Sequence, residues 1–258
     1  MKIGGMNHPQ QDPVAEIHNF KSLGLEFVDL TLEPPAAASW KVDVKAIRRA
    51  LEETGMGVVG HTAYYLAIES PFEGIRKAAV EELKTCLRIF AEVGAKWMNV
   101  HPGRYTPMHP RSFFIERDIL SLGELIEEGK RVGCGVMVEN IPGDFNTPDE
   151  LGELLSALPE LGLHLDIGHA NLSVPWHMTG PILDRWGDRL KHVHLHDNKG
   201  GYADLHLALG QGTLDIRSAL SAVKKCGYDD FITLEVFSED DHFLVYSRDR
   251  LREIWESL

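Results

Sequence analysis

Short apolar segments alternate with longer amphipathic segments along the whole chain. The short segments favour β-strands, because buried parallel strands carry runs of Val, Ile and Leu, whereas the longer segments repeat apolar residues at helical spacing. Eight strands are expected, at Lys2–Met6, Leu25–Thr31, Gly57–His61, Trp97–His101, Gly135–Glu139, Leu161–Asp166, Leu190–His196 and Phe231–Glu235. Helices are expected at Asp43–Glu53, Gly74–Val93, Ile115–Val132, Pro148–Ala157 and Ile216–Lys225. Strands that alternate with helices in this way predict an α/β protein, a closed (β/α)8 TIM barrel.

The alternative fold is an open doubly wound sheet, which needs a glycine-rich phosphate turn between an early strand and its helix. Gly4-Gly5 stands alone and begins no helix, so the barrel is preferred. The 258 residues are a usual length for one such barrel, and no linker or internal repeat interrupts them. We therefore expect a single barrel domain over residues 1–258.

Composition narrows the choice of partners. No apolar run is long enough to cross a bilayer, and the N-terminus has no apolar leader, so we expect a cytoplasmic protein with no membrane partner. The three cysteines are widely spaced and are expected to be reduced thiols. The net charge of −13, from 39 acidic against 26 basic residues, disfavours nucleic acid as a partner without excluding a local basic patch.

Residue types that bind metals stand where the predicted strands end. In a (β/α)8 barrel, functional residues lie at these strand ends and in the loops that follow them. The ligand-type residues there are His61, His101, Glu139, Asp166, His169, His194, Asp204, His206 and Glu235. One histidine or aspartate at a strand end is usually an ordinary polar residue, but the whole set predicts a bound divalent metal. Mixed nitrogen and oxygen ligands suit zinc, manganese or iron better than magnesium or calcium.

The seventh predicted strand carries three of the histidines of the chain. The two-residue period of a strand places His192, His194 and His196 on one face and Val193 and Leu195 on the other. If the histidine face points into the barrel, the imidazoles converge with the carboxylates of the other strand ends on a shared volume.

With these motifs in this order, the chain resembles the xylose isomerase-like barrel superfamily, which holds sugar and sugar-phosphate isomerases and epimerases together with the endonuclease IV family. The resemblance rests on His61, His101-Pro-Gly, Glu139-Asn140, Asp166-x-x-His169, His194-x-x-Asp197, Asp204-x-His206 and Thr-Leu-Glu235. The likeness to endonuclease IV implies three zinc ions. One is held by His61, His101 and a bridging Glu139, the second by Glu139, Asp166, His194 and Glu235, and the third by His169, Asp204 and His206.

The likeness to the isomerases implies a simpler site. A single metal is held by Glu139, Asp166, His194 and Glu235, and the two glutamates are the expected catalytic bases on opposite sides of the substrate. Both schemes together give one to three zinc or manganese ions per chain. Tyr64, Asn140 and His196 are expected to contact the substrate; Tyr64 also matches a nuclease position near the DNA lesion, and its simpler interpretation is an aromatic pocket wall.

The chain departs from both families. Against endonuclease IV it has Ile167-Gly168 for Thr-Cys, His196 for Asn, and Leu205 for a basic residue. Against the ketose 3-epimerases it has Phe145 for a glutamate, and residues 198–200 lack an expected arginine. These departures leave the substrate open.

The preferred hypothesis is a divalent-metal-dependent isomerase or epimerase acting on a small-molecule sugar or sugar phosphate. The alternative is an endonuclease IV-like phosphodiesterase that cleaves at apurinic sites with a multinuclear zinc centre. A third hypothesis is a non-catalytic barrel that binds metal or sugar. The segment Leu251–Leu258 is expected to be a barrel helix, a packing surface or a contact in a homo-oligomer.

Overall fold

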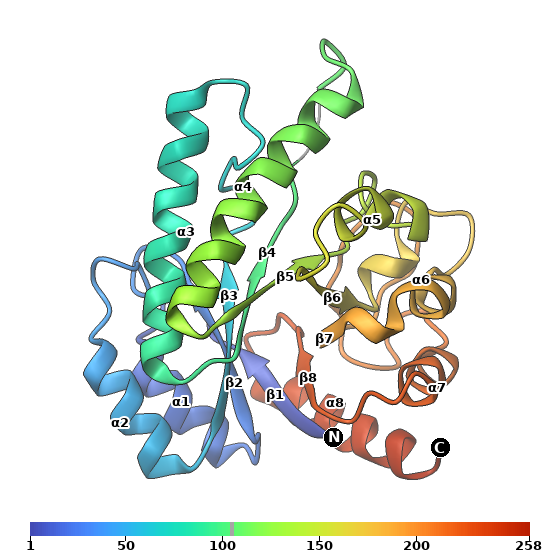
Figure 1. Ribbon diagram of the computed structural model, residues 1–258. Helices are drawn as coiled ribbons and strands as arrows, with labels where there is room; N and C mark the ends of the chain where they lie inside the picture. The colour runs from blue at the N-terminus through green and yellow to red at the C-terminus, as the bar shows by residue number, and fades with distance from the viewer. Residues whose placement is uncertain (104–105) are drawn as a thin grey trace.

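The computed structural model describes residues 1–103 and 106–258. Eight parallel strands pair in sequence order and the last pairs with the first, so the sheet closes into a barrel (Figure 1). The strands are β1 (Lys2–Met6), β2 (Phe27–Leu32), β3 (Gly57–Thr62), β4 (Trp97–Val100), β5 (Gly135–Glu139), β6 (Gly162–Asp166), β7 (Leu190–Leu195) and β8 (Phe231–Leu234). The predicted (β/α)8 barrel is confirmed. His101, His196 and Glu235 lie one residue beyond their strands rather than inside them.

Eight α-helices surround the strands. They are α1 (Pro13–Ser22), α2 (Val44–Thr54), α3 (Glu73–Val93), α4 (Arg111–Val132), α5 (Pro148–Leu155), α6 (Thr179–Trp186), α7 (Ile216–Lys225) and α8 (Asp241–Glu256). Two 3-10 turns, η1 (His169–Asn171) and η2 (Gly187–Arg189), lie on either side of α6. The five predicted helices are present, but the sequence pattern indicated no helix at α1 or α6 and only the last part of α8. α4 also begins four residues earlier than predicted, at Arg111 instead of Ile115.

The helix boundaries follow from local capping chemistry. Asp43 accepts a hydrogen bond from the backbone nitrogen of Ala46 (3.0 Å) and so begins α2. Thr147 and Glu150 form a reciprocal capping box at the start of α5. Gly94 ends α3 with a φ of 95°, in the left-handed region that favours glycine. Each of these residues lies at an end of a helix expected from the sequence, so these helix boundaries have a local structural cause.

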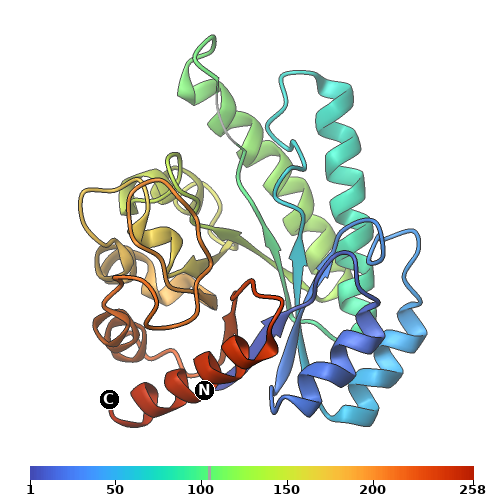
Figure 2. The same ribbon diagram turned by 180° about the vertical axis from the view of Figure 1, so that it is seen from behind.

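Helices α3 and α4 lie side by side and extend past the strands in both views (Figures 1 and 2). Arg76 of α3 is buried between them and donates to Ser121 Oγ and to Glu124 Oε1, each at 2.9 Å. It also binds Glu73 of its own helix through Nε and Nη2. This network satisfies the guanidinium, whose burial unpaired would be costly. Within the described residues, no helix is both long and apolar enough to cross a membrane.

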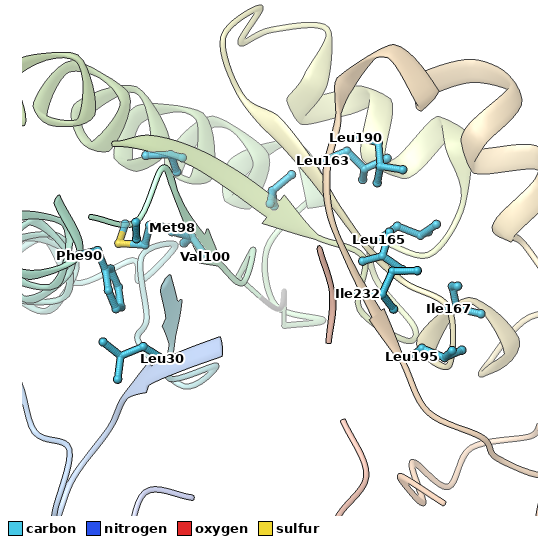
Figure 3. Packing of buried hydrophobic residues seen from close by; sticks show 14 of the residues in the cluster. Leu30, Phe90, Met98, Val100, Leu163, Leu165, Ile167, Leu190, Leu195 and Ile232 are labelled. Carbon is cyan, nitrogen blue, oxygen red and sulfur yellow. The ribbon is translucent and has the colours of Figure 1, made fainter. Parts of the chain in front are cut away.

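The main apolar core lies between the barrel and its helices. Leu30, Met98 and Val100 pack near Phe90 of α3, and Leu163 and Leu165 pack on the other side of the barrel (Figure 3). A separate small cluster contains Phe27, Val59 and Met137.

Several strand residues that alternate with residues of the main apolar core are polar. Asp29, Asn99, His164, His192 and Thr233 are all buried. Because successive side chains of a strand point to opposite faces, these residues form a polar layer on the inner face of the barrel. This polar layer lies directly beneath the candidate site.

Candidate metal centre

All nine predicted ligands gather at the carboxyl ends of the strands. Eight of the side chains are buried or nearly so, and the Asp204 side chain is 34% exposed. They fall into three overlapping groups, centred on Glu139, on His194 and on Asp204. The sequence-based expectation that these residues meet is therefore realised in the geometry, and their role as ligands remains a proposal.

Glu139, the last residue of β5, is the centre of the first group. Its Oε2 lies 3.1 Å from His101 Nε2 and 3.8 Å from His61 Nε2. Its Oε1 lies 3.3 Å from His169 Nδ1. The amide of Asn99 donates to Oε2 at 2.6 Å and fixes the carboxylate from below. Two carboxylate oxygens thus face three imidazoles, which is a donor set suited to zinc or manganese.

His194 is the centre of the second group. Its Nδ1 lies 3.3 Å from Glu235 Oε2 and 3.9 Å from Asp166 Oδ2. Its other nitrogen, Nε2, lies 2.6 Å from Asp29 Oδ2. A ligand histidine commonly directs one nitrogen to the metal and donates the other N–H to a carboxylate, and His194 has this arrangement.

Asp29 is a site residue that sequence reasoning missed. It lies on β2, is buried, and accepts a hydrogen bond from Thr233 Oγ1 at 2.9 Å. His192 Nε2 also lies 3.3 Å from its Oδ2. Burial alone would raise the pKa of Asp29, but the neighbouring His192 and His194 outweigh burial and hold that pKa well below its ordinary value. The available signal was an aspartate at an inward position of a strand that is otherwise buried.

Asp204 is the centre of the third group, in the loop between β7 and α7. Its Oδ2 lies 3.0 Å from both His169 Nε2 and His206 Nε2. Burial lowers the pKa of His206, but Asp204 and Glu235 outweigh this and raise it to about 9. The backbone of His206 has a φ of 45°, an uncommon conformation for a residue with a side chain.

The carboxylates and histidines of the site shift one another's pKa values. Burial favours the neutral form of Glu139 and Asp166, yet the surrounding histidines hold both carboxyl pKa values well below normal. The same carboxylates raise the pKa of His169 and His194 well above that of a free imidazole, again against the effect of burial. The site therefore presents ionised carboxylates at neutral pH.

Three atoms of the predicted site residues are buried without a hydrogen-bond partner in the described part of the chain. They are His101 Nδ1, Asp166 Oδ2 and His196 Nε2. Buried polar atoms are normally satisfied, and atoms of this type that face one another leave a position suited to a cation. The residues present therefore fit a divalent metal.

A cavity of 1290 Å³ opens above the groups. Glu139, Asp204, His206 and Glu235 line it, whereas Asp166, His194 and His196 lie beneath its wall. Its rim carries five more acidic residues, Glu16, Glu33, Glu239, Asp240 and Asp241. Among the described residues, no lysine or arginine lines it. The cavity is therefore strongly acidic apart from its histidines.

The three predicted substrate contacts have different surroundings. Tyr64 lines the cavity and is largely exposed. Asn140 does not line the cavity, because its Nδ2 donates to Asp166 O (3.0 Å) and its Oδ1 accepts from Asp166 N (2.7 Å). It supports the Asp166 backbone instead. His196 is also fully buried and lies against Asp166 and Asp204.

The chain matches the family described as "Xylose isomerase-like TIM barrel" over residues 17–256. An uncharacterized protein of Methanocaldococcus jannaschii, MJ1311, is 30% identical over 71% of this chain and 64% of its own length, just under two thirds of that relative. A ketose 3-epimerase of Arthrobacter globiformis is 25% identical over 94% of this chain and 83% of the relative. A probable endonuclease 4 of Aquifex aeolicus is 27% identical over 92% of both chains.

The solved structure of a D-tagatose 3-epimerase-like protein has the same fold. It superposes with a TM-score of 0.85 at 24% identity and covers 100% of this chain and 98% of its own. The family match spans nearly the whole barrel and includes every residue of the three groups. The chain belongs to the xylose isomerase-like TIM barrel family.

Proposed function

We propose that the chain is a divalent-metal-dependent epimerase or isomerase that acts on a sugar. The observation that carries this proposal is the position of Glu139 and Glu235. Both line the acidic cavity, and each lies against ligand-type histidines. Glu139 ends β5 and Glu235 follows β8, three strands further round the barrel. The ketose 3-epimerase relative supports the same reaction class.

Glu139, Asp166, His194 and Glu235 would hold the metal that the reaction uses. When bound there, a divalent ion would supply a Lewis acid for the carbonyl and hydroxyl oxygens of a sugar, which would acidify the hydrogen on the carbon beside the carbonyl. The carboxylates supply the remaining chemistry. Asn99 hydrogen-bonds to Glu139 and keeps its carboxylate in position. Asp29 does the same for the ring of His194.

Epimerisation requires a proton to leave one face of a carbon and another to arrive on the opposite face. One glutamate removes the proton, the carbon becomes planar, and the second glutamate returns a proton from the other side. The pKa of Glu139 is held low by its histidines, so the carboxylate is ionised and able to accept a proton. Two carboxylates on separate strands meet this geometric need, and one would not.

The charge of the cavity favours an uncharged sugar over a sugar phosphate. A phosphate group is bound in proteins by Arg, Lys or converging backbone N–H groups, and carboxylates repel it. The described cavity wall has a surplus of carboxylates and neither Lys nor Arg. The same surplus of carboxylates disfavours binding of DNA, because proteins bind its phosphates mainly through basic residues.

The test uses metal-loaded protein incubated in deuterium oxide with a panel of ketoses and the matching ketose phosphates. Exchange of the proton beside the carbonyl, followed by NMR, reports turnover whichever product is formed. Glu139→Gln should lose the exchange, while Glu52→Gln on the exposed face of α2 should retain it. Full exchange by Glu139→Gln would exclude the proposed base.

A second candidate is an endonuclease IV-like phosphodiesterase. His61 and His101 favour it, because both lie close to Glu139 although an epimerase with one metal does not need them. The Aquifex aeolicus relative points in the same direction. Incision of an oligonucleotide with an abasic site by the wild type, lost in Glu139→Gln, together with no exchange on any sugar, would replace the epimerase proposal with this one.

A further inference from the structure

His196 lies with the third group of ligands, not with the substrate cavity. Its Nε2 is 3.5 Å from Asp204 Oδ1, and ligand atoms of His169, His196, Asp204 and His206 all lie within 4.8 Å of one another. In a tetrahedral zinc site with bonds of about 2.0–2.1 Å, ligand atoms are separated by roughly 3.3 Å. The three imidazoles lie 3.0, 3.0 and 3.5 Å from the Asp204 carboxylate, on either side of that separation, so small movements of the side chains would place all four residues around one ion.

The three imidazoles have the same orientation relative to Asp204. Each directs its Nδ1 to a main-chain carbonyl: His169 to Asn140 O (3.0 Å), His206 to Glu235 O (3.1 Å) and His196 to Asp197 O (3.4 Å). A carbonyl oxygen accepts only, so a neutral ring must carry its proton on Nδ1. The lone pair is then on Nε2, and all three Nε2 atoms face the Asp204 carboxylate. Backbone anchors of this kind fix metal-binding tautomers.

His196 Nε2 is the unsatisfied atom of the group. The residue is fully buried, and the atom has no hydrogen-bond partner, with Asp166 Oδ1 and Asp204 Oδ1 at 3.4 and 3.5 Å. A buried nitrogen with a free lone pair among carboxylates needs a positive charge beside it. A divalent ion supplies that charge and satisfies His196 and Asp204 together.

Gly168 provides the space that His196 occupies. A Cβ at residue 168 would lie 2.1 Å from His196 Nε2, a distance that atoms do not adopt. Any side chain at 168 would therefore displace the imidazole. Gly168 and His196 are both positions where the chain departs from the endonuclease pattern, and the structure shows that the two departures depend on each other.

We propose that His196 joins His169, Asp204 and His206, the three residues that the likeness to endonuclease IV assigns to one zinc ion, and closes their site with a fourth protein ligand, so that the site binds zinc for structural reasons. Four protein ligands fill a tetrahedral zinc ion and leave no position for substrate, unlike a catalytic site with three. The ion would tie the loop between β7 and α7, which carries Asp204 and His206, to the end of β6. This site is separate from the ion at Glu139, Asp166, His194 and Glu235, and it does not depend on which reaction that ion serves.

The neighbouring Asp197 shows how the loop is otherwise held. Its carboxylate accepts backbone N–H groups from Gly210 (2.8 Å), Gly212 (2.9 Å) and Leu214 (3.2 Å). These bonds fix the second half of the loop to β7. The main chain of Asp197 also pairs with Leu207, directly after His206, through two hydrogen bonds of 2.9 Å. Zinc at the four-ligand site would therefore fix Asp204, which precedes this pairing and which the bonds of Asp197 do not reach.

The test measures metal binding rather than turnover. Metal-free protein is titrated with zinc, bound zinc is counted by elemental analysis, and affinity is measured against a competing chelator. Cobalt reports geometry, because tetrahedral cobalt absorbs visible light far more strongly than five- or six-coordinate cobalt. The wild type should bind an ion with a strong tetrahedral cobalt spectrum, and zinc should raise its melting temperature.

His196→Asn should lose that cobalt spectrum and one zinc ion, with an affinity loss beyond the ~10–100-fold typical of an outer-shell partner. His194→Asn should keep the tetrahedral spectrum, and His242→Asn, at an exposed histidine, should match the wild type throughout. Gly168→Ala should bind zinc as weakly as His196→Asn. If His196→Asn keeps the wild-type zinc count, affinity and cobalt spectrum, the four-ligand site is excluded. The same conclusion follows if His194→Asn alone abolishes the tetrahedral spectrum.

Discussion

Replacing Asp29 by asparagine tests whether the buried polar layer controls the metal centre above it. Asp29 Oδ2 lies 2.6 Å from His194 Nε2 and accepts from Thr233 Oγ1 at 2.9 Å. Asparagine keeps the shape of the side chain but removes the negative charge. The N–H of His194 then loses its charged acceptor, and the ring loses the contact that sets which nitrogen faces the cavity.

The size of the effect follows from these contacts. Loss of an outer-shell carboxylate of this kind lowers metal affinity by ~10–100-fold, which corresponds to about 1.4–2.7 kcal/mol of binding free energy. In the metal-free protein, Asp29 and His194 are a buried charged pair, and removing one partner of such a pair costs about 3–5 kcal/mol of unfolding free energy. We therefore expect Asp29→Asn to bind zinc more weakly than the wild type and to unfold at a lower urea concentration.

Zinc affinity measured against a chelator and urea unfolding of metal-free protein provide the two readouts. Thr233→Val is the matched control. It removes a neutral hydroxyl that donates to Asp29 and lies 2.9 Å from His192 Nε2, and it leaves the charge of Asp29 and the His194 contact in place. It should cost about 1 kcal/mol of stability and change zinc affinity little. If Asp29→Asn binds zinc as tightly as the wild type, His194 is not a metal ligand positioned by Asp29, and the reasoning fails.

The pKa of His206 is raised to about 9, so its stabilising contribution in metal-free protein is complete below pH ~6.5 and is lost as the pH rises toward 9. The melting temperature of the zinc-free protein should therefore fall over this pH range. The melting temperature of the zinc-loaded protein should instead rise with pH, because ligand imidazoles release protons when they bind zinc. Parallel pH profiles with and without zinc would contradict this prediction. Glu139→Gln should lower turnover by at least the ~10²–10⁴-fold attributed to one acid–base group, with an unchanged circular dichroism spectrum, and near-normal turnover would contradict the assigned role. Arg76→Leu should remove the Arg76 donor from Ser121 Oγ and leave the Glu124 carboxylate with Lys84 alone. The loss of these hydrogen bonds to a charged group should lower the free energy of unfolding by about 1.5–3 kcal/mol. A calorimetric melting temperature equal to that of the wild type would contradict the role assigned to this network.

The fold was predictable because each strand signal is local. Runs such as Val136–Val138 identify a buried parallel strand from composition alone, and all eight strands are confirmed. The missed helices carry weaker signals. α1 buries only Pro13, Ile17 and Phe20, although Asp12 before Pro13 is a recognisable start. α6 is short and includes Gly180 and Pro181 near its beginning, which favour a loop interpretation.

The gathering of the ligands was predictable for a topological reason, since the carboxyl ends of all strands meet at one end of a barrel. The contacts that each ligand makes with its neighbours were not predictable. Asp29 and His194 are 165 residues apart, and their contact depends on how β2 and β7 face each other across the barrel. The direction of His196 depends on the backbone at Gly168, which no residue type near His196 indicates. Periodicity gives the face of a side chain but not the atom that it meets.

The contact between Gly168 and His196 also constrains how the two residues can change over time. A histidine at 196 cannot hold its ring in the present position while residue 168 carries a side chain, so this position of the ring requires glycine at 168. Glycine at 168 makes no such demand on residue 196. Among chains with this barrel, a histidine at the position of His196 should therefore occur only with glycine at the position of Gly168. An alignment could then identify the members that share this pair before any of their structures is known.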